Sequence, residues 1–340
     1  MNDALRPLRA MPPIERLAEG LWSLPVPLPI DSLRYVYTYV LESPSGAYLV
    51  DTGWDTPEAW SALCAGLEHI GYGVADVQGI LVTHAHPDHY GLAGRIQEQS
   101  GCWIGMHPRE ADVVRRQADE TDSGAGFGSD DYMRQAGVPQ HELRRLSSSG
   151  MPNFPKIDLV QPDRLIEDGE SVDIPEWDIR AVWTPGHTPG HLCFHLPELG
   201  ALLSGDHVLP RITPNISYQV DGNHDPLSDF LHSLAKVADL APDVVYPAHE
   251  YRFVGIAERV SDIVRHHQAH LDEILALLQA GAVTLWDVTS RMSWSGRWDS
   301  FDMFRTLSAL SEAAAHLRTL QTRGLVTQLP GNAWRLAPVS

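Results

Sequence analysis

A run of potential metal ligands directly follows an apolar stretch of this sequence, and few folds accommodate such a run. The stretch covers residues 80–82, and the ligands that follow it are His84, His86, Asp88 and His89. Side chains two residues apart in extended backbone point to the same side, so His84 and His86 can bind one ion. Pro87 bends the chain away from strand pairing, and the next two ligands can then face a second ion. The run predicts two adjacent metal positions at a strand end.

Three further potential ligands repeat this placement, because each follows a short strand-like run. The runs cover residues 179–183, 201–203 and 244–246, and the ligands after them are His187, Asp206 and His249. We therefore expect four strand ends to converge on one sheet edge.

The donor types predict which metals can bind and what they can do. Imidazole and carboxylate donors without thiolates suit zinc, and also manganese or iron. We predict two Zn²⁺ ions per chain, with the ligands divided as follows: His84, His86 and His187 on one ion, Asp88, His89 and His249 on the other, and Asp206 as the bridge. A catalytic site keeps a coordination position for water. A hydroxide that bridges the ions is the expected nucleophile.

With this ligand set the chain resembles the hydrolases of the metallo-β-lactamase superfamily, and most closely the glyoxalase II and lactamase-like subgroup. The match spans about residues 15–255, and every metal position of the family pattern is filled. The resemblance implies an α/β fold, namely an αββα sandwich of two mixed sheets with helices outside and metals at one sheet edge. It also implies that Asp51 orients the ligand histidines, although Asp-Thr-Gly after a strand is ordinary turn chemistry as well. His191, His195 and His207 are interpreted as supporting or structural residues.

Composition and charge narrow the choice of partner and compartment. The chain has 340 residues, a net charge of -19 and three isolated cysteines. A net charge of this size repels a polyanion, so we expect no nucleic-acid partner. Metals and a few arginines can still attract phosphates locally. Sparse cysteines fit a reducing compartment, and residues 1–20 contain no unbroken apolar segment. We expect a cytoplasmic protein without a membrane segment.

Two domains are expected, a catalytic domain at residues 1–255 and a small, mostly helical, winged-helix-like domain at 256–340. The pattern in the second domain predicts helices at 257–279, 285–292 and 301–322, and strands at 325–328 and 333–336. From residue 262 onward this region carries seven acidic and seven basic side chains, which is a poor balance for binding phosphates. We interpret it as a cap that helps to shape the substrate cleft or mediates a homodimer.

Residues 108–170 are predicted to form a lid-like insertion, because clusters of glycine, serine and proline separate their periodic stretches. Phe127, Met151 and Phe154 would be its apolar contacts with substrate. The alternative is a surface excursion that does not contact substrate.

Two further flap candidates are residues 25–30 and 209–218, which are rich in proline and apolar side chains. Within the second flap, Arg211 and Tyr218 are candidate contacts to the substrate or its oxyanion. A surface charge and a packed aromatic are the alternative interpretations. Phe154, Arg211 and Tyr218 are thus the predicted substrate-binding residues.

The predicted reaction is hydrolysis of a small-molecule thioester, of the acyl-CoA or acyl-carrier type, or of a lactone or other ester. The metals would stabilise the oxyanion, and Asp88 would orient the hydroxide and transfer its proton. A single-stranded RNA or DNA nuclease of the lactamase-like type and a mononuclear iron sulfur dioxygenase remain alternatives. A binding protein with a structural metal clamp is a further one, but structural sites are normally closed.

Overall fold

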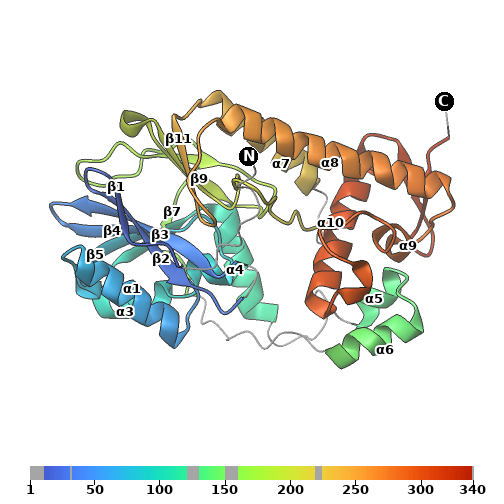
Figure 1. The fold of residues 1–340 in the computed structure, drawn as a ribbon, viewed down its shortest axis with the longest axis horizontal. Coiled ribbons are helices and arrows are strands. Elements are labelled where there is room, and N and C mark those ends of the chain that lie inside the picture. Colours follow the sequence, from blue (N-terminus) through green and yellow to red (C-terminus); the bar gives the residue numbers. More distant parts are fainter. Residues whose placement is uncertain (1–10, 31–32, 121–129, 150–159, 219–223, 339–340) are drawn as a thin grey trace, which may run out of the picture.

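The computed structural model describes residues 11–30, 33–120, 130–149, 160–218 and 224–338 of the chain. Figure 1 shows a sheet-rich part on the left and a helical part on the right, joined along the top by the long helix α8 (Ile256–Gln279). Phe127, Met151 and Phe154, the predicted apolar contacts to substrate, lie outside the described residues.

The larger sheet has seven strands in sequence order. They are β1 (Glu15–Ala18), β2 (Leu21–Pro27), β3 (Tyr35–Ser43), β4 (Gly46–Val50), β5 (Val77–Leu81), β6 (Trp103–Met106) and β7 (Arg164–Leu165). Strands β1 to β4 pair antiparallel, as in a meander. Strands β4 to β7 pair parallel, because helical crossovers separate them in the sequence.

The smaller sheet has four strands in the order β11-β10-β9-β8. Their bounds are β8 (Arg180–Trp183), β9 (Leu192–Leu196), β10 (Ala201–Gly205) and β11 (Val244–Pro247). The pairs β8 with β9 and β9 with β10 are antiparallel, whereas β10 and β11 are parallel. Both sheets are therefore mixed, as predicted.

Alternating side chains on the strands produce a four-layer sandwich. Tyr39 of β3 belongs to the core between the sheets, whereas its neighbour Val40 belongs to the core under the outer helices. In the same way, Leu203 of β10 faces the inner core and Leu202 faces the opposite side. Since successive strand residues point to opposite faces, both sheets are buried on two sides. This confirms the predicted αββα arrangement.

Helices cover both outer faces of the sandwich. The helices that precede α8 are α1 (Pro57–His69), α2 (Pro87–Tyr90), α3 (Ala93–Ser100), α4 (Pro108–Glu120), α5 (Asp130–Gln135), α6 (Gln140–Ser149) and α7 (Pro226–Asp239), with short 3-10 helices η1 (Val74–Asp76) and η2 (Pro197–Leu199). Helices α1, α3 and α4 pack on the seven-stranded sheet. Helix α7 packs on the four-stranded sheet, together with α8. No helix in the described part of the chain is both long and apolar enough to cross a membrane.

The C-terminal region is helical, with one small hairpin. It contains α8, α9 (Leu285–Thr289), η3 (Trp298–Ser300) and α10 (Met303–Thr322), followed by β12 (Val326–Leu329) and β13 (Ala333–Leu336). The strands pair antiparallel. This element order agrees with the sequence prediction to within a few residues, while the winged-helix assignment itself stays a prediction.

Helices α5 and α6 of the expected lid pack against the C-terminal region. Met133 and Leu146 share a core with Trp286 of α9 and Leu307 of α10. The backbone N–H of Trp286 donates to the Ala136 carbonyl at 2.8 Å. Figure 1 shows both helices beside α10, on the right of the molecule. The lid-like role of residues 108–170 remains a prediction, but this part of the segment has a fixed partner.

Candidate metal centre

The seven predicted ligands come from four strand ends at one edge of the sandwich. His84 and His86 follow β5, and α2 then supplies Asp88 and His89. His187 lies in the turn between β8 and β9, Asp206 follows β10 directly, and His249 follows β11. Pro87 is the first residue of α2, where its fixed φ and missing N–H are compatible with a helix start. The expected convergence of strand ends is therefore present.

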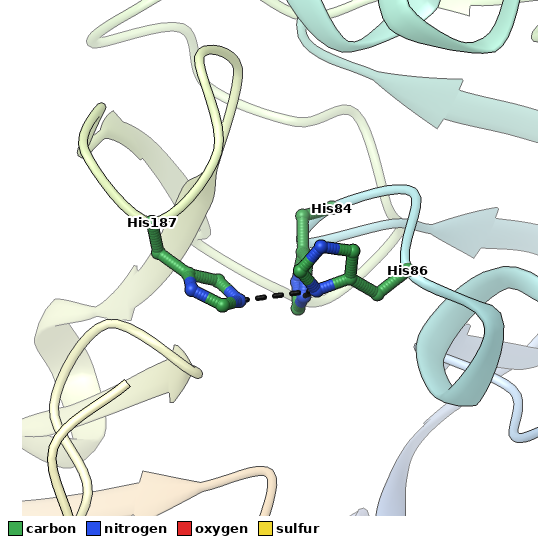
Figure 2. A group of neighbouring side chains, drawn as sticks. All are labelled: His84, His86 and His187. Carbon is green, nitrogen blue, oxygen red and sulfur yellow. Dashed lines mark hydrogen bonds between the residues drawn. The ribbon is translucent and has the colours of Figure 1, made fainter. Parts of the chain in front are cut away.

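Three of the histidines form one tight group. The Nε2 atom of His84 lies 2.9 Å from Nδ1 of His86, which lies 3.1 Å from Nε2 of His187. Figure 2 shows these three rings pointing toward one another, two from the segment after β5 and one from the turn between β8 and β9. A zinc ion binds nitrogen at about 2.0–2.1 Å, so two nitrogen ligands of one ion lie roughly 3.0–3.5 Å apart. The spacing fits a shared ion.

The remaining ligands form a second group beside the first. The Nε2 atom of His249 lies 3.3 Å from Oδ2 of Asp88 and 3.3 Å from Oδ1 of Asp206. The Nε2 atom of His89 lies 3.6 Å from an oxygen of each of these carboxylates. The Oδ2 atom of Asp206 is also 3.7 Å from Nε2 of His187, in the first group. Asp206 therefore lies between the groups, where the sequence places a bridge.

Buried nitrogen and oxygen atoms without hydrogen-bond partners indicate that the second group and Asp206 suit a metal. The Nε2 atoms of His89 and His249 and Oδ1 of Asp206 are buried and have no hydrogen-bond partner. Buried polar atoms without partners are costly, and a cation between them would satisfy all three. The residues present therefore fit a divalent metal centre.

The second ring nitrogen of each of three ligand histidines is held by the protein. The Nδ1 atom of His249 donates to the Tyr35 carbonyl at 3.0 Å, and that of His187 donates to the Asn215 carbonyl at 2.8 Å. The Nδ1 atom of His89 lies 2.7 Å from Oδ2 of Asp51. Metal-binding histidines commonly show this arrangement, because the bond fixes both tautomer and ring orientation.

The pKa shifts of the histidines differ between the first group and the second. Burial, helped by neighbouring imidazoles, lowers the pKa of His86 to about 3 and holds the pKa of His84 well below its usual value. Burial also acts to lower the pKa of His89, but nearby carboxylates outweigh it and raise this pKa well above its usual value. The first group is thus neutral and rich in nitrogen, and the second is a mixed carboxylate and imidazole group.

Asp51 connects β4 to the ligand run. Its Oδ1 accepts from the Thr83 N–H at 2.8 Å, and its Oδ2 accepts from the Thr83 hydroxyl at 2.8 Å and faces His89 at 2.7 Å. Its backbone φ is 59°, a left-handed conformation that few residues other than Gly, Asn and Asp adopt. Ordinary turn chemistry does not account for these long-range contacts.

Glu110 on α4 is a supporting residue that the sequence reasoning missed. Its side chain is buried, with Oε1 accepting from the Ala85 N–H at 2.8 Å. Its Oε2 accepts from the Thr188 hydroxyl and the Gly190 N–H, both at 2.9 Å. Burial raises the pKa of the Glu110 carboxyl, against these hydrogen bonds. Nothing in the local sequence marks this residue, because its partners lie on two other segments.

Two of the histidines interpreted as supporting residues lie close to the ligands. His191 is fully buried, and its ring bonds the Thr184 hydroxyl at 2.8 Å and the Asp206 N–H at 3.3 Å. His207 is fully buried beside Phe230. The packing also requires Gly205, since a Cβ there would lie 2.8 Å from Nε2 of His191. His195 lies within β9, away from these contacts, and is partly exposed.

The predicted substrate contacts Arg211 and Tyr218 have protein partners. The guanidinium of Arg211 donates to Oε1 of Glu250 at 2.6 and 2.8 Å, directly after the ligand His249. The backbone N–H of Tyr218 donates to the Ser311 hydroxyl of α10 at 3.1 Å. Both residues lie near the ligand segments, and their role in substrate binding stays a prediction.

The fold and the site together define an αββα protein with a His- and Asp-rich metal centre at one sheet edge. Residues 31–249 match the model of the family described as "Metallo-beta-lactamase superfamily". This chain belongs to that superfamily.

Similar proteins cover almost the whole chain. A "Beta-lactamase-like protein 2 homolog" of Caenorhabditis elegans is 24% identical over 324 residues, which is 92% of this chain and 88% of that protein. The crystal structure of a metallo-beta-lactamase family protein from Thermus thermophilus has a TM-score of 0.78 and 30% identity, covering 94% of this chain and 100% of that one. A beta-lactamase domain protein from Burkholderia ambifaria has a TM-score of 0.80 and 26% identity, covering 95% and 94% of the two chains. The similarity therefore includes the C-terminal region.

Proposed function

We propose that this protein is a dinuclear metal-dependent hydrolase. The observation that carries the proposal is the presence of two adjacent ligand groups with Asp206 between them. In the proposed assignment His84, His86 and His187 would hold one ion, Asp88, His89 and His249 would hold the other, and Asp206 would contribute to both. We assign zinc to both positions, with manganese or iron as alternatives, because the donors are imidazoles and carboxylates.

Bound divalent ions would supply an activated water at neutral pH and polarise the bond to be broken. The chain's own groups orient the reaction. Asp88 is buried and lies 3.3 Å from His249 and 3.6 Å from His89. These imidazoles lower the pKa of Asp88 to about 2, against burial, so its side chain is an ionised carboxylate. We propose that this carboxylate orients the attacking water and takes its proton. Asp51 and the Tyr35 carbonyl hold the two rings in position.

The proposed substrate is a small thioester of the acyl-CoA or acyl-carrier type, with a lactone or other ester as the close alternative. The net charge of -19 supports a small molecule over a nucleic acid, because nucleic acids bind through basic surfaces. The complete second ligand group supports hydrolysis over mononuclear iron chemistry, which needs only one group. We place the protein in the cytoplasm, and we propose a homodimer as its assembly.

The test is metal content measured on the same sample as activity. Elemental analysis is expected to give about two zinc ions per chain at the seven predicted ligands, together with hydrolysis of an acyl-CoA or a lactone from a panel that also contains a β-lactam and single-stranded RNA. Asp206→Ala should lower metal content and turnover together. Asp243→Ala, at an acidic residue outside both groups, is the control.

Other outcomes of this test have definite meanings. Full activity in an Asp206→Ala variant that has lost the second metal would overturn the dinuclear mechanism. One iron per chain without hydrolysis would indicate oxygen chemistry, as in a sulfur dioxygenase. Cleavage of RNA alone would make the protein a nuclease despite its charge.

A further inference from the structure

A second cluster of possible metal ligands lies between two C-terminal helices, outside the centre described above. Helix α8 contributes His266, His267 and His270, and helix α10 contributes Glu312 and His316. Three of these histidines are buried, namely His267, His270 and His316. Five such side chains on two packed helices are unusual in a region that otherwise resembles a helical cap.

Helix geometry explains why these side chains meet. Residues four apart in a helix lie on the same face, so His266 and His270 form one pair and Glu312 and His316 form another. The helices pack through a common core that includes Ile263 of α8. The two pairs therefore face each other, as in metal sites built between the helices of bundles.

The donor atoms are close enough to share an ion. One ligand atom from each of His270, Glu312 and His316 lies within 4.8 Å of the other two, and the same holds for His266, His267 and Glu312. The His267 ring also contacts the His316 ring, since Nδ1 of His267 lies 3.1 Å from Nε2 of His316.

The protein orients one of these ligands and leaves others unbonded. The Nδ1 atom of His316 donates to the Glu312 carbonyl at 2.8 Å, so Nε2 carries the lone pair. This is the arrangement seen at the ligands of the first centre. The Nε2 atom of His267 and Nδ1 of His270 are buried without a hydrogen-bond partner. A purely structural histidine cluster would leave these two nitrogens unpaired.

Electrostatics also favours a cation at this position. Burial, together with neighbouring imidazoles, lowers the pKa of His267 to about 2, and burial lowers the pKa of His316 to about 3. Both rings are therefore neutral, as metal binding requires. Burial raises the pKa of the Glu312 carboxyl to about 7, against the Asn215 hydrogen bond. A divalent ion would stabilise the ionised carboxylate among these neutral rings.

We propose that this cluster is a second metal site that takes a zinc-type divalent ion. Glu312, His270 and His316 form one ligand set, and Glu312, His266 and His267 form an adjacent alternative set. With several protein ligands from two packed helices, the site is structural. It would clamp α8 to α10.

The clamp is connected to the catalytic centre through one residue. The Asn215 side chain donates to Oε2 of Glu312 at 3.0 Å, and its backbone carbonyl accepts from the ligand His187 at 2.8 Å. An ion that fixes the carboxylate also fixes Asn215 and, through it, the ring of His187. Loss of the clamp is therefore expected to weaken metal binding at the first group.

The test compares zinc content in four forms of the full chain. These are the parent, a cluster variant with His270→Ala and His316→Ala, a centre variant with His84→Ala and Asp206→Ala, and the combination of both. Each is loaded with zinc, desalted and measured by elemental analysis, with folding checked by circular dichroism. The cluster change should remove at least about one zinc ion per chain in both backgrounds. A control with His69→Ala and His195→Ala, outside both clusters, should keep the parent content.

A second measurement covers the case in which the double substitution does not fold. Glu312→Gln keeps the side-chain volume and an oxygen for Asn215 but removes the charge. It should bind zinc more weakly than the parent in the centre-variant background, with a smaller rise in Tm on zinc addition. Equal zinc content with and without the cluster ligands, or an unchanged zinc response in Glu312→Gln, would overturn the proposal. Neither result bears on the hydrolase proposal, which depends on the first centre.

Discussion

Asp51 illustrates how much of this metal centre depends on single side chains that bind no metal. Three hydrogen bonds converge on its carboxylate, two from Thr83 and one from His89. The left-handed backbone of Asp51 directs the side chain toward the ligand run. Because such support fixes both the tautomer and the position of a ligand ring, it contributes to metal affinity without a direct bond.

Replacement of Asp51 by Asn is expected to weaken metal binding and turnover by roughly 10- to 100-fold. Asn tolerates the same backbone conformation, so the effect comes from the lost carboxylate oxygen that faces His89. Zinc affinity measured by competition with a chelator, alongside turnover, checks this. Asp55→Asn is the matched control, since Asp55 is partly exposed and pairs with Arg95. Parent-like zinc affinity in Asp51→Asn would leave Asp51 as a turn residue only.

The sequence was most informative for the metal ligands, because their spacing along the chain indicates that they lie together. The ligand run at residues 84–89 is contiguous, and the structure brings together all seven predicted ligands. The substrate contacts were less accessible to sequence reasoning, because a sequence does not reveal partners. Arg211 pairs with Glu250, which is distant along the chain.

Among the secondary-structure elements, helix α4 connects the two segments that carry the first ligand group. Its residue Glu110 bonds Ala85, between two ligands, and also Thr188 and Gly190 beside His187. Close contact requires glycine at position 190, since a Cβ there would lie 2.3 Å from the Glu110 nitrogen. The helix thus sets the distance between segments about a hundred residues apart in sequence.

Glu110→Gln is expected to lower zinc affinity at the first group, by roughly 10- to 100-fold. The amide nitrogen of Gln cannot accept a hydrogen bond, so at least one of the three donors would lose its partner. Chelator competition and the zinc content after dialysis measure the effect. Glu142→Gln on helix α6 is the control, because Glu142 pairs with His141 and Arg145 on its own helix, far from the ligands in the sequence. Equal zinc retention in both variants would contradict this role for Glu110.

Across the molecule as a whole, one apolar core joins the sandwich to the C-terminal region. Val182 of β8 and Phe230 of α7 belong to the same cluster as Leu271 of α8 and Leu317 of α10. This core spans the predicted boundary at residue 255, and the division into two domains stays a prediction. Helices α5 and α6 add a further contact with the C-terminal region.

The shared core predicts a single unfolding transition for the metal-free full chain. Scanning calorimetry should give calorimetric and van't Hoff enthalpies that agree. A chain ending at residue 254 should aggregate or unfold, because removal of α8 exposes the apolar side of α7. Two well-separated transitions, or a stable truncated chain, would instead establish two independent domains.

Local sequence patterns were enough to predict the ligand set, and the class of fold followed from the family resemblance that this set carries. Ligands after strand-like runs are local patterns, and local patterns can be read along a chain. The C-terminal helices were predictable for the same reason, since their apolar periodicity is a local signal.

Packing between distant segments decides which residues support the ligands and which form the cluster in the C-terminal region. The sequence does not reveal this packing. Glu110 and Asn215 act through partners on other segments, so no pattern among their sequence neighbours indicates their role. The histidines of α8 and the Glu312 and His316 pair of α10 lie about fifty positions apart, and each is an ordinary helical pattern alone. Packing of the two helices creates the cluster, because contacts between distant segments depend on the fold and not on local periodicity.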